Sequence, residues 1–315
     1  MTFLATLLYF PIDNINVLII FRFIHGVVMG IAFAVMQTTV MDLIPDERRG
    51  EGISFYTLNF ILGTAIGPFL GVYISQIADM QTIFIVGTIM TGISVLLSIF
   101  TTIPKGYITH EQIEEMKGFH FKDFVEVKAL PIAVLMGILA LSYSGILSFL
   151  TTYSMEINLM TAASLFFIIY SVIVLISRPI TGGILDKKGD NVVMYPAIVL
   201  FSAGLFVLSQ AESGFILLFG GVLIGLGFGN LQSSLQAVAI KRVRGYRVGL
   251  AISTFFICHD IGVGMGPFLL GYLVPQIGYR KMYLTLAIIV FASAFIYYVI
   301  HGNKSAHNKQ ISSQV

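Results

Sequence analysis

Tryptophan is absent from this sequence, cysteine occurs once, and charged residues are scarce. The lone Cys258 excludes an intrachain disulfide framework and any metal cluster built on cysteines. Only 11% of the 315 residues are charged, against about 25% in soluble domains. Hydrophobic residues reach 57% and the mean hydropathy is +0.90, which is the composition of a membrane protein. Without tryptophan, tyrosine and phenylalanine have to anchor the chain at the membrane interfaces.

The sequence signs of several enzyme and binding classes are missing as well. No GxxxxGK[ST] loop occurs, so ATP is not expected to drive this protein. The histidines show no close pairing of the kind that holds a metal. They are His25, His110, His120, His259, His301 and His307. The net charge is only +2 and its basic residues are spread among loops, so no nucleic-acid partner is expected. We therefore predict no enzyme activity, no cofactor and no metal.

Among the long apolar runs, residues 53–77 are the most informative. This run has no charged residue and is long enough to cross a bilayer core of about 30 Å. Gly63, Gly67 and Gly71 recur every four residues, so they share one helix face that a neighbouring helix can approach closely. Pro68 removes a backbone donor and predicts a kink in this helix.

The same element recurs 199 residues later, where Gly262, Gly266 and Pro267 repeat two of the glycines and the proline. Without a gap, this shift also superimposes residues of the preceding helices, namely Gly26 on Gly225, Gly30 on Gly229 and Gln37 on Gln236. The shift covers six predicted helices, an even number, so the two copies have the same orientation. The second copy begins near residue 129, and its counterpart would precede Met1. About two helices are therefore expected to be missing, either by truncation or because the protein is a degenerate relative.

Nine complete membrane spans and one partial span are predicted. They are residues 1–10 (partial), 15–43, 53–77, 82–103, 130–153, 162–177, 192–209, 215–240, 248–275 and 283–300. Residues 104–128 form the longest polar segment, whose mixed charges indicate a solvated linker. The predicted organisation is an N-terminal lobe at 1–103, the inter-lobe linker at 104–128, a C-terminal lobe at 129–301 and a tail at 302–315.

The loop charges test this count of spans. If the loops alternate between the two sides, fifteen of the 18 basic residues fall on one side. Only Arg280 and Lys281 fall on the other, and Arg22 lies within a span. This split follows the positive-inside rule and places the linker and the C-terminus in the cytoplasm of a multi-pass protein of the cell membrane.

Three stretches have the character of family motifs: GTAIGPFLG at 63–71, LIIFRFIHG at 18–26 and RPITGGILDKKG at 178–189. Together they resemble the major facilitator superfamily, and within it the drug:proton antiporter branch. The first stretch resembles the antiporter motif of the fifth helix. The second resembles the fourth-helix motif with its membrane arginine, here Arg22, and His25 stands where that motif often has glutamine.

The third stretch resembles the gating-loop motif in its C-terminal copy, with Arg178, Gly182, Asp186 and Gly189 at its key positions. Asp190 departs from the basic residue usual after it. The resemblance covers nearly the whole chain. It implies an all-α membrane protein, a major-facilitator-type helical bundle of two pseudo-symmetric lobes with about ten of twelve helices present.

Three residues inside predicted spans are candidates for proton coupling. Arg22 is expected to face the lobe interior, because a guanidinium is costly to bury in hydrocarbon, and to lower the pKa of a nearby carboxylate. A structural or snorkelling arginine is the alternative. Asp260 lies near the middle of its span, where desolvation would raise its pKa and let it load and release a proton, and His259 could titrate near neutral pH. The alternative is a polar pair that joins two helices.

The candidate substrate-cavity residues are polar or aromatic side chains at helical positions, with interhelical packing as the alternative for each. They are Gln37, Tyr143, Asn230, Gln232 and Gln236. Arg178 and Asp186 are expected to form a charge latch that helps to balance the inward-open and outward-open states.

The expected function is proton-coupled efflux of small amphipathic molecules by alternating access. The partners would be a small-molecule substrate, protons and the lipid bilayer, with the chain acting as a monomer. An importer or an exporter of a metabolite or metallophore is the alternative within transport. A truncated, non-transporting paralogue is the alternative outside it.

Overall fold

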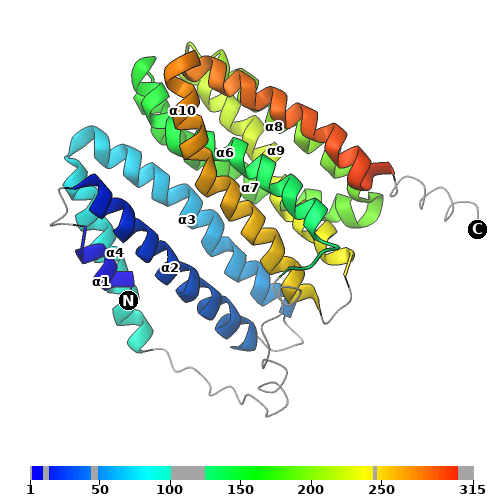
Figure 1. The fold of residues 1–315 in the computed structure, drawn as a ribbon, viewed down its shortest axis with the longest axis horizontal. Helices are drawn as coiled ribbons and strands as arrows, with labels where there is room; N and C mark the ends of the chain where they lie inside the picture. Colours follow the sequence, from blue (N-terminus) through cyan, green and yellow to red (C-terminus); the bar gives the residue numbers. More distant parts are fainter. Residues whose placement is uncertain (1, 10–13, 44–48, 101–124, 244–246, 304–315) are drawn as a thin grey trace, which may run out of the picture. The chain divides into compact units, whose positions relative to one another are not determined.

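A computed structural model describes residues 2–9, 14–43, 49–100, 125–243 and 247–303 (Figure 1). For some of these residues, most of them between 34 and 65, it describes the backbone only. The described residues form helices and short turns, without a strand. By its internal contacts the chain divides into two units, residues 1–63 with 70–117 and residues 64–69 with 118–315. Each unit is considered by itself.

The N-terminal helices include one short element that packs on its neighbours. Helix α1 contacts α2 and α4, where the ring of Phe3 lies against Gly92. Helix α3 continues on both sides of Pro68, and the kink expected there stays a prediction. The elements are α1 (Thr2–Leu7), α2 (Ile15–Leu43), α3 (Arg49–Ile77) and α4 (Met80–Ile99).

The second unit is a bundle of long apolar helices. Its elements are α6 (Leu130–Glu156), α7 (Met160–Lys188), α8 (Asp190–Ser209), α9 (Gly214–Lys241), α10 (Val248–Tyr297) and the π-helical turn η4 (Tyr298–Gly302). Helix α10 consists of two arms that meet at Gly278, whose φ of 77° is a backbone conformation that glycine adopts without strain. These arms correspond to two separately predicted spans.

Seven helices of the described part are long and apolar enough to cross a membrane. One of these seven contains both arms of α10. Helix α3 accounts for a further predicted span, and α1 lies where the partial span was expected. The prediction of an all-α membrane protein is confirmed.

The core of the second unit contains buried residues of α6, α7, α8, α9 and α10, and within it α9 packs on α7 and α8. Glycines on α9 permit this close packing, since a Cβ at Gly225 would lie 2.9 Å from the carbonyl oxygen of Tyr170 on α7. The rings of Phe201 on α8 and Phe228 on α9 are buried against each other. Outward-facing residues are also apolar, as Phe215 at 80% exposure and Phe268 at 70% show. A bundle apolar inside and outside suits a lipid environment.

The two predicted glycine faces differ in what covers them. A Cβ at Gly262 would collide with the Gly137 carbonyl of α6, so α10 and α6 meet at backbone contact. A Cβ at Gly266 would likewise collide with the side chain of Ser144. In α3, no described atom lies within 4 Å of a Cβ built at any of the three glycines of that face, which are Gly63, Gly67 and Gly71.

Candidate functional site

A buried polar cluster joins α7 to α9. Asn230 is fully buried, and its amide nitrogen donates to Ser177 Oγ at 2.9 Å and to the Leu226 carbonyl at 2.9 Å. Its amide oxygen accepts a hydrogen bond from Thr181 Oγ1 at 2.7 Å. Every strong hydrogen-bonding atom of this amide therefore has a partner, which supports a packing role for Asn230.

Two and six residues further along α9, Gln232 and Gln236 have different surroundings. They are four residues apart and so lie on one helix face, and both are partly exposed. Among the described residues, neither amide has a hydrogen-bond partner. Tyr143 of α6 is buried instead, with its ring stacked on Phe228 at a centroid distance of 4.0 Å. The substrate-cavity role of Gln232 and Gln236 stays a prediction.

The motif expected as a gating loop is helical over most of its length. Arg178, Gly182 and Asp186 lie within α7, which continues past Pro179 to Lys188. Gly189, with φ of 88°, makes the connection to α8. Arg178 Nε is buried and has no hydrogen-bond partner among the described residues.

The Asp186 side chain lies outside what the structure describes, so the Arg178–Asp186 latch stays a prediction. The Gln37 side chain is likewise not described, although its backbone is helical in α2.

In the first unit, Arg22 and His25 of α2 share one tyrosine. The Arg22 guanidinium lies over the Tyr9 ring, 4.9 Å from its centroid. The Tyr9 hydroxyl is hydrogen-bonded to His25 Nδ1 at 2.9 Å, and Tyr9 also stacks on Phe84 of α4. A cation over an aromatic face is a favourable contact. No carboxylate among the described residues pairs with Arg22, so its expected acid partner is not located.

His259 and Asp260 form a hydrogen-bonded pair on the first arm of α10. His259 Nδ1 lies 2.8 Å from Asp260 Oδ1. The Asp260 side chain is 76% exposed and that of His259 only 16%, so the two residues do point in different directions. The described residues do not desolvate Asp260, and its proton-coupling role stays a prediction.

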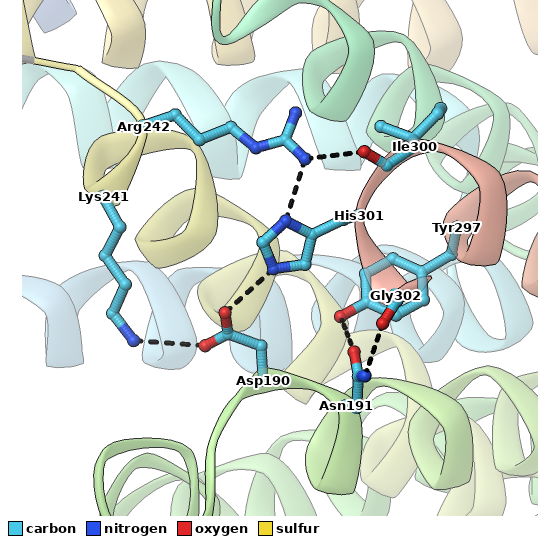
Figure 2. A network of polar contacts seen from close by, with 8 residues as sticks. All are labelled: Asp190, Asn191, Lys241, Arg242, Tyr297, Ile300, His301 and Gly302. Atoms are coloured by element: carbon cyan, nitrogen blue, oxygen red, sulfur yellow. Dashed lines mark hydrogen bonds and ion pairs between the residues drawn. The ribbon is translucent and has the colours of Figure 1, made fainter. Parts of the chain in front are cut away.

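The most extensive polar network lies where α8 begins and α9 and η4 end (Figure 2). The Asp190 carboxylate accepts from Lys241 Nζ at 3.1 Å and contacts His301 Nε2 at 2.9 Å. The other ring nitrogen, His301 Nδ1, lies 2.8 Å from Arg242 Nη2, which also donates to the Ile300 carbonyl at 3.0 Å. An arginine can only donate, so Nδ1 accepts and Nε2 carries the proton toward Asp190. His301 is therefore neutral in this arrangement.

A second pair of bonds reinforces the same end of the bundle. Asn191 Nδ2 donates to the Gly302 carbonyl at 2.9 Å, and the Tyr297 hydroxyl donates to Asn191 Oδ1 at 2.9 Å (Figure 2). This network explains why Asp190 departs from the motif, because a basic side chain there would repel Lys241. In the sequence, Asp190 stands out only as a departure from the motif. Its partners, 51 and 111 positions away, gave no local signal.

Glu126 was assigned to the solvated linker, yet it is buried and holds the start of α6 against α10. Its carboxylate is ion-paired with the Arg247 guanidinium. Its backbone nitrogen donates to Thr254 Oγ1 at 2.8 Å. The hydrogen bond from Arg247 lowers the pKa of Glu126 below its usual value. The chain is therefore fixed to the second unit two residues before the predicted linker ends.

These contacts lie at separate places. In the second unit, Asn230 bonds to Ser177, the residue before Arg178 in α7, while the Asp190 network occupies one end of the bundle. Arg22 belongs to the first unit with Tyr9, a residue that sequence analysis did not single out. A tyrosine just after a short helix carries no distinctive sequence signal. Tyr9 is identified only by its contacts with Arg22 and His25 of α2 in the structure.

Comparison with known proteins places the chain among membrane transporters. The family model described as Major Facilitator Superfamily matches residues 1–267 and 161–314. An uncharacterised MFS-type transporter of Methanocaldococcus jannaschii is 22% identical over 308 residues, covering 94% of this chain and 78% of the relative. The staphylopine export protein of Staphylococcus aureus is 24% identical, covering 85% and 70%. A multi-drug resistance efflux pump of Streptococcus pneumoniae is 23% identical, covering 90% and 72%.

Proposed function

This chain belongs to the Major Facilitator Superfamily, and from that premise we propose that it exports small amphipathic molecules in exchange for protons. The observation that carries the proposal is the backbone-close interface of Gly262 and Gly266 with α6. It lies where the motif of the drug:proton antiporter branch recurs in its second copy. The relatives that are named as exporters support the direction of transport.

Two lobes, residues 1–103 and 129–301, would rock about a midplane cavity, joined by the linker at 104–128 and followed by a tail at 302–315. Gln232 and Gln236 would contact the substrate, because their amides have no hydrogen-bond partner among the described residues. Tyr143 and Gln37 are further candidates for the cavity wall. Such a site needs a few placed polar groups in apolar surroundings.

Asp260 would load a proton on one side and release it on the other as access alternates, with His259 holding its carboxylate. Arg22 would favour the ionised form of a carboxylate that comes near it. Gly189 would let α7 and α8 change their angle, while Arg178 and Asp186 form the proposed latch. The predicted monomer, with its C-terminus in the cytoplasm of the cell membrane, completes this proposal.

Proteoliposomes with an imposed pH gradient test the proposal. We expect gradient-dependent movement of amphipathic dyes, and we expect Asp260→Asn to abolish it without changing the yield of folded protein. Unchanged gradient-driven movement in Asp260→Asn would remove Asp260 from coupling, and no movement of any compound would refute transport by this chain. A panel that includes a metallophore belongs in the same experiment, because one relative is named as a staphylopine exporter.

A further inference from the structure

An open groove of about 590 Å³ lies at the end of the second unit that carries the Asp190 network. Its lining combines a lysine, an arginine and a histidine with three apolar side chains, contributed by the residues just before and at the start of α6, the residue after α9, and η4. They are Lys128, Arg242, His301, Pro131, Val299 and Ile300. This end of the helices coincides with the end of several predicted spans, where membrane headgroups lie.

The carboxylates nearby are ion-paired with other side chains than Lys128 and Arg242. The Glu126 carboxylate pairs with Arg247, and that of Asp190 pairs with Lys241 and contacts His301. Among the described residues, no carboxylate lies within ion-pair distance of Lys128 Nζ, and Lys128 is exposed.

The Arg242 guanidinium is held in place beside it. One of its amino groups donates to the Ile300 carbonyl and to His301 Nδ1. Its other N–H groups have no partner among the described residues. A fixed guanidinium with free donors suits a phosphate, which takes two hydrogen bonds from one arginine.

We propose that this groove binds the phosphate of an anionic phospholipid. Lys128 and Arg242 would contact the phosphate, while Val299 and Ile300 would lie along the glycerol and the first acyl carbons. The apolar wall favours a lipid over a free anion, since Val299 is 61% exposed and would gain from contact with hydrocarbon. Basic pockets between helix ends are known to hold acidic lipid headgroups. The site is independent of whether the protein transports.

Binding of spin-labelled phosphatidylglycerol and phosphatidylcholine to the purified full chain tests this proposal. We expect preferential immobilisation of phosphatidylglycerol. Lys128→Gln should weaken that preference about fivefold, because one basic residue near an acidic membrane contributes roughly 1 kcal/mol. The matched control is Lys187→Gln, which removes another exposed charge from the last turn of α7, outside the groove. It should keep the wild-type preference.

Further measurements in the same experiment distinguish a bound lipid from a bound soluble anion. Val299→Ser should weaken phosphatidylglycerol binding while leaving competition by inorganic phosphate unchanged. Equal immobilisation of both lipids would overturn the proposal, as would an equal loss in Lys128→Gln and Lys187→Gln. Displacement of the lipid by inorganic phosphate at matched concentration would assign the groove to a soluble anion instead. Unchanged helix content in Lys128→Gln, measured by circular dichroism, ensures that a loss reports on the site.

Discussion

Asn230 and Gln232 lie two positions apart on α9 and have opposite surroundings. The first has its amide fully bonded within the bundle, and the second has no partner among the described residues. The same residue type, a side-chain amide, therefore serves two purposes on one helix. The sequence grouped them as cavity residues because it shows polarity and spacing but not the partner helix.

Asn230→Ala should lower the free energy of unfolding by about 1–2 kcal/mol, because interhelical hydrogen bonds in membrane proteins contribute roughly 0.6 kcal/mol each and up to about 1.7 kcal/mol. Thermal unfolding of the purified protein in detergent measures this loss. Gln232→Ala is the matched control, expected to leave unfolding unchanged and to reduce efflux of the best dye. If both variants are equally unstable, the distinction between packing and cavity residues is wrong.

The Glu126–Arg247 ion pair gives stability a defined pH dependence. The pKa of Glu126 is lowered in the folded protein, so its contribution is complete above the unfolded-state pKa of about 4.3 and is lost as pH falls through the lower folded value. Glu126→Gln should therefore make the unfolding temperature fall less steeply as the pH is lowered. Measurements from pH 7 down to about pH 3 would show it.

Glu212 provides the control for that measurement. Its carboxylate lies 3.5 Å from Arg280 but its side chain is 75% exposed, so water screens the pair. Glu212→Gln should leave the pH profile as in the wild type. If the unfolding temperature of Glu126→Gln falls with pH as it does in the wild type, other carboxylates cause the acid sensitivity.

What the sequence could predict depends on how local the signal is. The spans and the glycine repeat follow from runs and spacings within single helices. The structure confirms the long apolar helices, and it places Gly262 against the backbone of α6. The Asp190 and Glu126 partners lie 51 to 121 positions away, which no local pattern encodes. Residues 178–189 were expected to form a loop from their resemblance to a family motif. Most of them are helical instead, with Pro179 inside α7.

At the scale of helices, the α10–α6 contact depends on the absence of side chains. A Cβ at Gly262 would meet the carbonyl oxygen and carbon of Gly137 and the backbone nitrogen of Leu141, and backbone atoms cannot rotate away. The helices would have to separate over this turn. Such overpacking typically costs about 1–3 kcal/mol.

Gly262→Ala should therefore lower the unfolding temperature and the yield of folded protein. Gly264→Ala, two residues away on the same arm, meets nothing within 4 Å among the described atoms and should stabilise slightly through helix propensity. Thermal unfolding of both variants in one detergent makes the comparison. Equal behaviour would mean that the close approach of α10 to α6 does not hold in the membrane.

At the scale of the whole molecule, the distribution of basic residues predicts the orientation in the membrane. In the second unit, the Asp190 network and the last turn of α7 lie at one end of the helices. Arg280 contacts the Ala211 carbonyl at the other end, between α8 and α9. The basic side chains gather at the first of these ends, which the positive-inside rule assigns to the cytoplasm.

Because Cys258 is the single cysteine, Cys258→Ser provides a background for site-specific labelling of this orientation. On that background, a membrane-impermeant maleimide added to intact cells should label Lys281→Cys and spare Lys187→Cys. Everted vesicles should give the opposite pattern, and permeabilised cells should label both. Both positions are exposed, so a missing signal in permeabilised cells would report misfolding. Labelling of Lys187→Cys in intact cells would invert the assignment and move the proposed phosphate groove to the outer leaflet.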